Sequence, residues 1–389
     1  MTTQTLNPIR PTPTSRHRFH LLDGLRGLAA IAVVYWHSPD YLWSRAGHSN
    51  YLAVDFFFCL SGFVVSFAYE RRLRDSLPFS EFVAARLIRL YPTFLLAVII
   101  ALPVYFTLSL PHPIGSALLK HFIVLIPLQL LMLPNYHIYP DVLLYPLLNP
   151  GWSLFFEILA NAAFGALVKL RRASLPYLLV IYAIALLSMI HWTRFHHDVS
   201  VGWASSFKSL CGGTARVALS FVAGVFVQRI HRHKAAQPFT MIVGTLLALA
   251  ITSALLFFML TPLNFMQTSQ YQLALLSVGF PGLVLLGSFC QIPKFFHPFC
   301  AFLGDISYPV YLFHYPILMI TTAPSVIRHI LRFPSLLHFV VPLMIVLISG
   351  LAYASQVLYE IPVRNFLTRR IGAIFERKRL NLNPVTAGK

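Results

Sequence analysis

Residues 22–37, LDGLRGLAAIAVVYWH, form an apolar stretch of the length that a membrane helix needs, and yet they include Asp23, Arg26 and His37. Charged and titratable groups inside a bilayer are costly unless they have partners, so we interpret these three as functional. The alternative is a His37 that bonds a neighbouring carbonyl and an Arg26 that anchors the helix at the cytoplasmic interface. At about 100° per residue, Arg26 and His37 fall on one face of a helix, about 16 Å apart along its axis. Asp23 precedes Arg26 by one turn, where it can serve as a counter-ion.

The composition of the whole chain indicates a polytopic membrane protein. Of its 389 residues, 57% are hydrophobic and 11% are charged, whereas a soluble domain carries about 25% charged residues. Apolar runs of about 20 residues recur along the sequence, which predicts an all-α integral membrane protein. The four cysteines lie in apolar segments without metal-ligand spacing, so we expect neither a metal site nor disulfides.

Ten apolar segments are predicted as transmembrane helices. They are residues 21–40, 53–70, 91–110, 151–169, 174–191, 213–229, 238–260, 271–290, 298–321 and 337–358. With both termini in the cytoplasm, 22 of the 30 Lys and Arg residues fall in cytoplasmic segments, the bias that membrane proteins show. The net charge of +18 is therefore interpreted as topology, and no nucleic-acid partner is expected.

The segments outside these spans complete the predicted organisation. Residues 1–20 are polar and basic and are predicted to be a disordered cytoplasmic tail, while residues 365–389 form a basic cytoplasmic C-terminal tail. Residues 21–364 then make up one membrane domain. Residues 115–133 are apolar enough to span, but a span there would turn every later basic loop outward. We therefore predict a re-entrant or interfacial helix at 115–133.

Three charged residues after the first span are further site candidates. Asp55 opens the second span near the outer end, at the depth of His37, and is expected to orient that histidine or to be a simple interfacial residue. Arg86 and Arg89 share one face of a short cytoplasmic helix. Two neighbouring guanidinium groups suit phosphates, although arginines at an inner membrane surface are also typical anchors.

The later spans carry polar residues of their own. Glu157 lies about two turns into the fourth span and needs a partner, for which Arg216 in the sixth span is one candidate. Trp152, at the start of that span, is either an interfacial aromatic residue or a stacking surface for a sugar. Small Ser61 and Gly62 in the second span are expected to allow close helix packing.

The ninth and tenth spans add a polar stripe and a charged pair. Ser307, Tyr311 and His314 fall at i, i+4 and i+7, a spacing that lines a bundle interior or a cavity. Glu360 and Arg364 are at i and i+4 at the inner end of the last span, which predicts a salt bridge.

Taken together, these motifs resemble those of the membrane-bound acyltransferase 3 family. The matching elements are Arg26 with His37, Phe57 to Phe63, Arg86 with Arg89, Trp152-Ser153-Leu154 with Glu157, Gly304 with Ser307, Tyr308, Tyr311, Leu312 and His314, and Glu360 with Pro362. Six elements in order over residues 22–364 make the resemblance specific. Larger members of the family carry a fused extracytoplasmic esterase-like domain, which we do not expect in this chain.

The resemblance implies an O-acyltransferase in the cytoplasmic membrane. Its co-substrate would be acyl-CoA, most often acetyl-CoA, held by Arg86 and Arg89, and its acceptor a hydroxyl of a glycan or lipid-linked sugar. His37 would act as general base or acyl carrier, with Arg26, Glu157 and Asp55 in catalytic support. The substrate pocket would include the residues Asp23, Trp152, Ser307, Tyr308, Tyr311 and His314.

Two other functions fit the same residues. Intramembrane charges and a polar stripe also occur in transporters, here of a polar or lipid-linked sugar solute, although no inverted repeat is visible. A non-catalytic membrane partner would leave His37 dispensable. The sequence leaves open the acceptor, the acyl chain length and any homo-oligomer.

Overall fold

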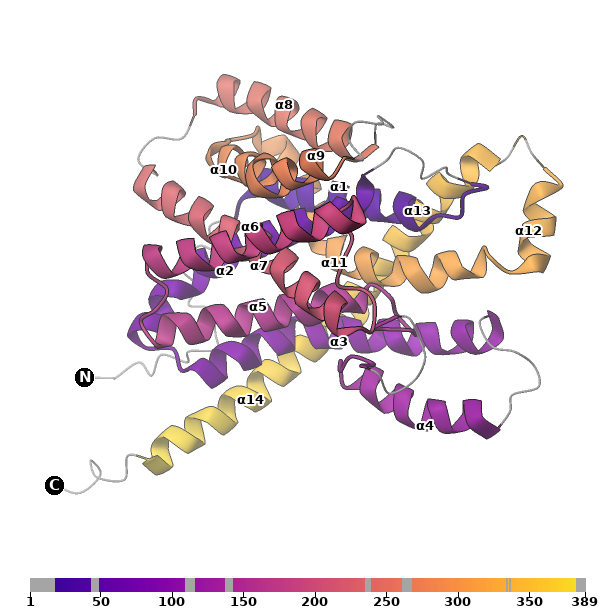
Figure 1. Ribbon diagram of the computed structural model, residues 1–389, viewed down its shortest axis with the longest axis horizontal. Helices are drawn as coiled ribbons and strands as arrows, with labels where there is room; N and C mark the ends of the chain where they lie inside the picture. The colour runs from indigo at the N-terminus through magenta and orange to yellow at the C-terminus, as the bar shows by residue number, and fades with distance from the viewer. Residues whose placement is uncertain are drawn as a thin grey trace.

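The computed structural model describes residues 18–42, 49–108, 116–136, 143–234, 239–260, 268–333, 335 and 337–382. Within these ranges the chain is a helical bundle whose only strand-like pairing is an isolated bridge between Leu143 and Ala204, which confirms the predicted all-α class (Figure 1). The elements in chain order are α1 His20–His37, η1 Asn50–Leu52, α2 Ala53–Asp75, α3 Phe79–Leu108, α4 Ser116–Leu130, α5 Gly151–Lys169, α6 Leu175–His196, α7 Phe207–Lys234, α8 Met241–Leu260, α9 Ser269–Ala274, η3 Leu275–Gly279, α10 Phe280–Phe289, η4 Lys294–Phe296, α11 His297–Ile320, α12 Pro324–Leu331, α13 Leu337–Ser355, η6 Gln356–Glu360 and α14 Ile361–Leu382.

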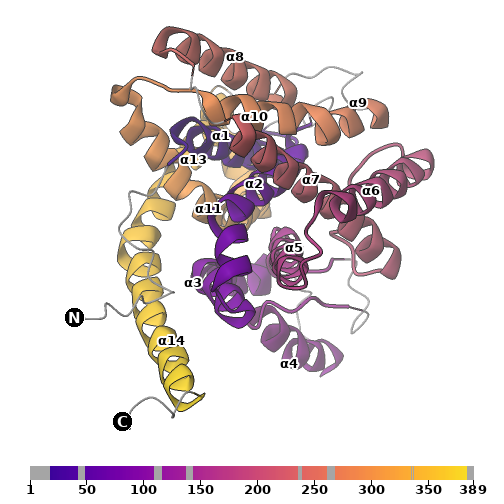
Figure 2. The same ribbon diagram turned by 90° about the vertical axis from the view of Figure 1, so that its left-hand side faces the viewer.

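Among the described residues, eight helices are long and apolar enough to cross a membrane, or nine if α11 and α12, which meet at an 82° bend, form one broken span. These nine correspond to nine of the ten predicted spans. The tenth predicted span, at 21–40, corresponds to α1, which is not among these nine helices. It has 18 residues, and its polar side chains lower its mean hydropathy. The last span continues without a break into α14, which projects away from the bundle in both views (Figures 1 and 2).

Two parallel helix pairs form the centre of the bundle. α1 packs along α11, where Gly24 faces Cys300 and Gly27 lies against Leu303. α2 packs along α7, where Gly62 and Gly224 each lie against a backbone carbonyl of the other helix. Small residues at these positions let the helix backbones approach closely, which is how helices associate in lipid. The interpretation of Gly62 as a packing residue is confirmed.

The predicted re-entrant or interfacial segment 115–133 contains α4, whose 15 residues are fewer than the roughly 20 that a membrane span needs. α4 lies beside α3 in both views (Figures 1 and 2). Its last carbonyl, that of Leu130, accepts a hydrogen bond of 2.8 Å from the Tyr91 hydroxyl of α3, and the Tyr145 hydroxyl bonds the Met132 carbonyl at 2.8 Å. Residues 144–148 then pack into the bundle interior before α5 begins.

Candidate active site

Polar side chains lie along the whole interface between α1 and α11, which we call the polar seam. Near the His20 end of α1, Arg18 bonds Asp23 at 2.7 Å and Asp305 at 2.6 Å. Arg26 follows on the same face, and His37, eleven positions after Arg26, lies at the other end of the seam. The predicted shared face of α1 is therefore the face that α11 covers.

At the far end of the seam, the rings of His37 and His314 meet. His314 Nε2 lies 3.2 Å from His37 Nδ1, and their ring centres are 4.8 Å apart. His37 Nδ1 is also 3.1 Å from the Val33 carbonyl, and His314 Nδ1 is 3.3 Å from the Val310 carbonyl.

The three nitrogen contacts assign the protons of both rings, because a carbonyl accepts and never donates. His314 carries its proton on Nδ1, so its Nε2 is an acceptor. His37 likewise carries its proton on Nδ1, shared between the Val33 carbonyl and His314 Nε2. The lone pair of neutral His37 is consequently on Nε2, and that nitrogen is the basic atom of the pair.

Arg26 is held in place by α11. Its Nε donates to the Ser307 hydroxyl at 2.9 Å, a second guanidinium nitrogen donates to the Gly304 carbonyl, and Asp23 lies 3.7 Å away. Ser307 in turn donates to the Gly304 carbonyl at 2.7 Å. The predicted pairing of Asp23 with Arg26 is confirmed, although Arg18 is the closer partner of Asp23.

The predicted arginine pair of α3 lies at the same end of the bundle as Arg26. Arg86 is buried, and its NH2 group donates to Glu157 at 3.2 Å, while the exposed Arg89 is close enough to both Arg26 and Arg86 for charge repulsion. The Nε atom of Arg86 is buried, and no described residue accepts a hydrogen bond from it. The guanidinium groups of Arg26, Arg86 and Arg89 therefore lie in one region together with the carboxylates of Asp23 and Glu157.

Glu157 is shared by two other helices. Its Oε1 accepts from Arg86 of α3 and, at 2.9 Å, from the Ser61 hydroxyl of α2. The sequence predicts a packing role for Ser61, and nothing in its local spacing indicates this bond to another helix. Beside this group, the Tyr308 hydroxyl donates to the Leu90 carbonyl at 2.6 Å.

Asp55 and Arg216 have each other as partners, which corrects two predictions. The Arg216 guanidinium donates to the Asp55 carboxylate with contacts of 2.6, 2.9 and 3.2 Å, and both side chains are fully buried. Asp55 was expected to pair with His37, but its partner is Arg216. Arg216 was a candidate partner for Glu157, but it pairs with Asp55. The reason is that α2 packs along α7, which aligns Asp55 with Arg216.

Trp152 and Tyr311 are buried between these groups. The Arg216 guanidinium lies 5.5 Å from the centre of the Trp152 ring, so this tryptophan stacks on a protein cation inside the bundle. The Tyr311 and Ser153 hydroxyls are 2.7 Å apart, and the Tyr311 ring is 5.9 Å from the ring of His314. Ser307, Tyr311 and His314 therefore line the bundle interior, as their spacing predicts.

Two further observations concern metals and the last span. Among the residues that the structure describes, no group of three or more His, Cys, Asp or Glu side chains could hold a metal ion. Arg364 bonds Glu360 at 3.2 Å, which confirms the predicted salt bridge, and Glu360 also accepts from Thr93 of α3 at 2.8 Å.

Comparisons with known proteins identify the family. The family model of the acyltransferase 3 group, described as an acyltransferase domain, matches residues 19–355. A peptidoglycan O-acetyltransferase, OatA, of Listeria monocytogenes is 27% identical over 347 residues, which cover 83% of this chain and 54% of that longer protein. Protein 2 in the picA locus of Rhizobium radiobacter is 36% identical over 160 residues, 38% of this chain and 81% of that protein. No solved structure matches the chain.

The family match covers both helix pairs and the seam from Asp23 to His37. It favours an enzyme over the transporter and the non-catalytic partner that the sequence also allowed. Several helices that could span a membrane make the chain a multi-pass membrane protein. The chain is an acyltransferase and belongs to the acyltransferase 3 family.

Proposed function

We propose that this enzyme transfers an acyl group, most often acetyl, from cytoplasmic acyl-CoA to a hydroxyl group of a glycan or lipid-linked sugar. The observation that carries the proposal is that the two ends of the seam along α1 carry different kinds of side chain. An arginine cluster lies at one end and a histidine pair at the other, about 16 Å apart along α1. Coenzyme A has the matching division, with phosphates at one end and a thioester at the end of a long arm.

The arginine cluster is the proposed phosphate site. Arg86, Arg89 and Arg26 supply positive charge, and the buried Nε of Arg86 offers a donor that the protein leaves without an acceptor. A phosphate oxygen would satisfy this donor and relieve the repulsion among the three cations. Because Arg26 is about three turns from His37, we assign it to the phosphates and not to the thioester carbonyl. Glu157 and Asp23 then orient the guanidinium groups.

His37 is the proposed catalytic residue. Its Nε2 takes the proton of the acceptor hydroxyl while the hydroxyl oxygen attacks the thioester carbonyl carbon. The tetrahedral intermediate then collapses, the carbon–sulfur bond breaks, and the departing sulfur takes the proton back from Nε2. In the covalent alternative Nε2 itself attacks the carbonyl and the carbon–sulfur bond breaks, which releases the coenzyme A thiolate. The acceptor hydroxyl then attacks the acyl-imidazole carbonyl, the carbon–nitrogen bond breaks, and the proton of the hydroxyl passes to the thiolate. In both routes His314 Nε2 accepts from His37 Nδ1–H and stabilises the charged ring.

The proposed donor decides in which membrane the enzyme lies, and a relative supports the class of acceptor. Because coenzyme A is cytoplasmic, the arginine end faces the cytoplasm and the protein lies in the cytoplasmic membrane. The Listeria monocytogenes relative is named for O-acetylation of peptidoglycan, which supports a sugar hydroxyl as acceptor.

The test is transfer of label from radiolabelled acetyl-CoA to cellular glycans and lipids in membranes that contain the protein. Wild type is expected to label one fraction, and His37→Ala is expected to label none, with a loss of about 100-fold or more for removal of a general base. His297→Ala is the matched control, because His297 stacks on His20 at 3.9 Å near the opposite end of the same seam. Retained transfer by His37→Ala, with the protein present in the membrane, would contradict the mechanism.

A further inference from the structure

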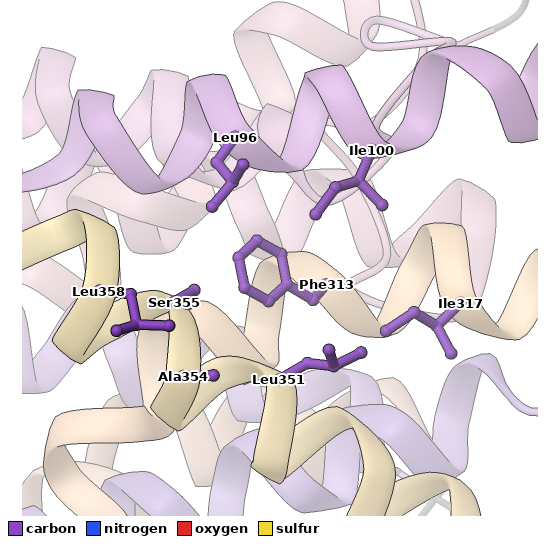
Figure 3. A pocket seen from close by; sticks show the side chains of 8 residues that line it. All are labelled: Leu96, Ile100, Phe313, Ile317, Leu351, Ala354, Ser355 and Leu358. Carbon is purple, nitrogen blue, oxygen red and sulfur yellow. The ribbon is translucent and has the colours of Figure 1, made fainter.

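An apolar groove runs between α3, α11 and the α13–η6 helix. It has a volume of about 230 Å³, and apolar side chains and Ser355 line it. Figure 3 shows Leu96 and Ile100 of α3 projecting toward it from one side, Phe313 at its centre, and Leu351 and Leu358 on the other side. The groove is not part of the polar seam, and no step of the proposed mechanism uses it.

The groove opens to the surface of helices that could each span a membrane. Phe313 at its centre is 1% exposed, whereas Leu358 at its rim is 78% exposed and Leu351 is 45% exposed. At the depth of membrane-spanning helices the surrounding medium is hydrocarbon, with no water to enter. The lining offers almost no polar group, so the occupant that fits is a hydrocarbon chain lying alongside the protein.

The groove adjoins the histidine pair. Phe313 and His314 are consecutive in α11, and Phe313 and Ile317 are one turn apart on the groove face. At about 100° per residue, His314 is on the neighbouring face of the same helix, where it meets His37. A chain seated in the groove would therefore reach the level of the histidine pair at Phe313, near the middle of the groove (Figure 3).

The α13–η6 wall of the groove is irregular. The π-helical segment η6 begins at Gln356, directly after the lining residue Ser355, and it contains the lining residue Leu358. A π-bulge inserts extra backbone into a helix and is frequent at functional sites. A second apolar groove, of about 140 Å³ between α5, α6 and α7, has neither a π-helical wall nor the histidine pair beside it.

We infer that the groove of α3, α11 and α13 seats the hydrocarbon chain of an amphiphilic acceptor, whose hydroxylated head group then lies at His37. This rests on the proposed function and narrows its acceptor to a lipid-linked class. The lining of α13 and η6 runs from Leu351 to Leu358, about 10 Å of helix, which matches a chain of about eight carbon atoms.

The test compares acetyl transfer to octyl glucoside and to methyl glucoside, with the protein in vesicles of one lipid composition. The measured quantity is the ratio of the two kcat/KM values, because partition of octyl glucoside into the bilayer is the same for every variant. Ala354→Phe and, on a different helix, Ile100→Trp would fill the groove. Each is expected to lower the ratio at least tenfold while leaving transfer to methyl glucoside within about twofold of wild type.

Ala163→Phe is the matched control, since it places the same side chain in the second apolar groove. It is expected to leave the ratio unchanged. An unchanged ratio in both Ala354→Phe and Ile100→Trp would overturn the inference. If wild type acetylates neither glucoside, that result would count against the sugar acceptor of the proposed function. Occupation of the groove would then be tested by a binding experiment.

That binding experiment uses an octyl glucoside with a photoreactive diazirine in its chain and reads the crosslinked residues by mass spectrometry. Crosslinks at groove residues such as Leu351 and Leu358 are expected in wild type and in His37→Ala, and their loss is expected in Ala354→Phe. Crosslinks without transfer would keep the groove and reject the proposed reaction. Crosslinks spread evenly over the lipid-facing helices, and unaffected by Ala354→Phe, would reject the groove.

Discussion

At the scale of single residues, the contact with His314 determines which nitrogen of His37 carries the proton, although His314 is not the proposed base. Its Nε2 accepts the Nδ1 proton of His37 at 3.2 Å, which leaves the lone pair of His37 on Nε2. The Val33 carbonyl shares this task at 3.1 Å. We therefore regard His314 as a positioning residue in the proposed reaction.

Replacement of His314 tests that role through the hydrogen bond alone. His314→Phe removes the acceptor and is expected to lower kcat about 10- to 100-fold, the cost typical of losing a partner that orients an active imidazole. His314→Gln keeps an acceptor oxygen at nearly the same reach and is expected to stay within about tenfold of wild type. Acetyl transfer by matched amounts of protein gives both values. Equal losses in the two variants would mean that His314 acts through packing.

Sequence alone could identify these residues but not all of their partners. Arg26, His37 and His314 stand out because each is a titratable group on the polar face of an apolar helix. The partner of Asp55 could not be inferred, because hydropathy reports depth along a helix and says nothing of which helices adjoin. Asp55 and His37 were expected at one depth, yet α2 packs on α7 and supplies Arg216 instead.

At the scale of helices, the contact of α2 with α7 depends on two glycines. A Cβ atom at Gly62 would collide with the Phe221 carbonyl, and one at Gly224 with the Cys59 carbonyl, so the helices would have to separate. The same contact aligns Asp55 with Arg216. Separation would thus weaken packing and a buried ion pair together.

Gly62→Ala is therefore expected to destabilise the folded protein by about 1–3 kcal/mol, the usual cost of overpacking. Gly350→Ala is the matched control, because a Cβ there meets no atom within 4 Å, and it is expected to be neutral or slightly stabilising in a helix interior. Thermal unfolding of the purified protein in detergent compares the two. Similar unfolding temperatures for both variants would show that the close approach of α2 and α7 is not limiting.

Helix ends were the least predictable feature at this scale. The span predicted at 91–110 belongs to α3, which begins twelve residues earlier at Phe79. Hydropathy finds only the part of a helix that lipid covers, whereas the backbone continues into a polar extension that carries Arg86 and Arg89. The same reason explains why the predicted C-terminal tail is helical through α14.

At the scale of the whole molecule, orientation in the membrane decides which end of the seam meets acyl-CoA. The bias of 22 of 30 basic residues predicts the loop between α5 and α6 inside and the turn between α11 and α12 outside. Arg172 and Thr322 are exposed in these two connections. They are therefore suitable positions for single cysteines that report on each side.

The measurement is labelling by a membrane-impermeant maleimide in spheroplasts before and after lysis, with the unsubstituted chain as background for its own four cysteines. Thr322→Cys is expected to react in intact spheroplasts, and Arg172→Cys only after lysis, because the charged reagent cannot cross the bilayer. The opposite pattern would place the arginine cluster outside, away from cytoplasmic coenzyme A. Phe82, one turn before Arg86 on α3, packs against Gly165 near the Arg172 end of α5. The opposite labelling pattern would therefore remove the basis for an acyl-CoA donor even if His37 proved essential.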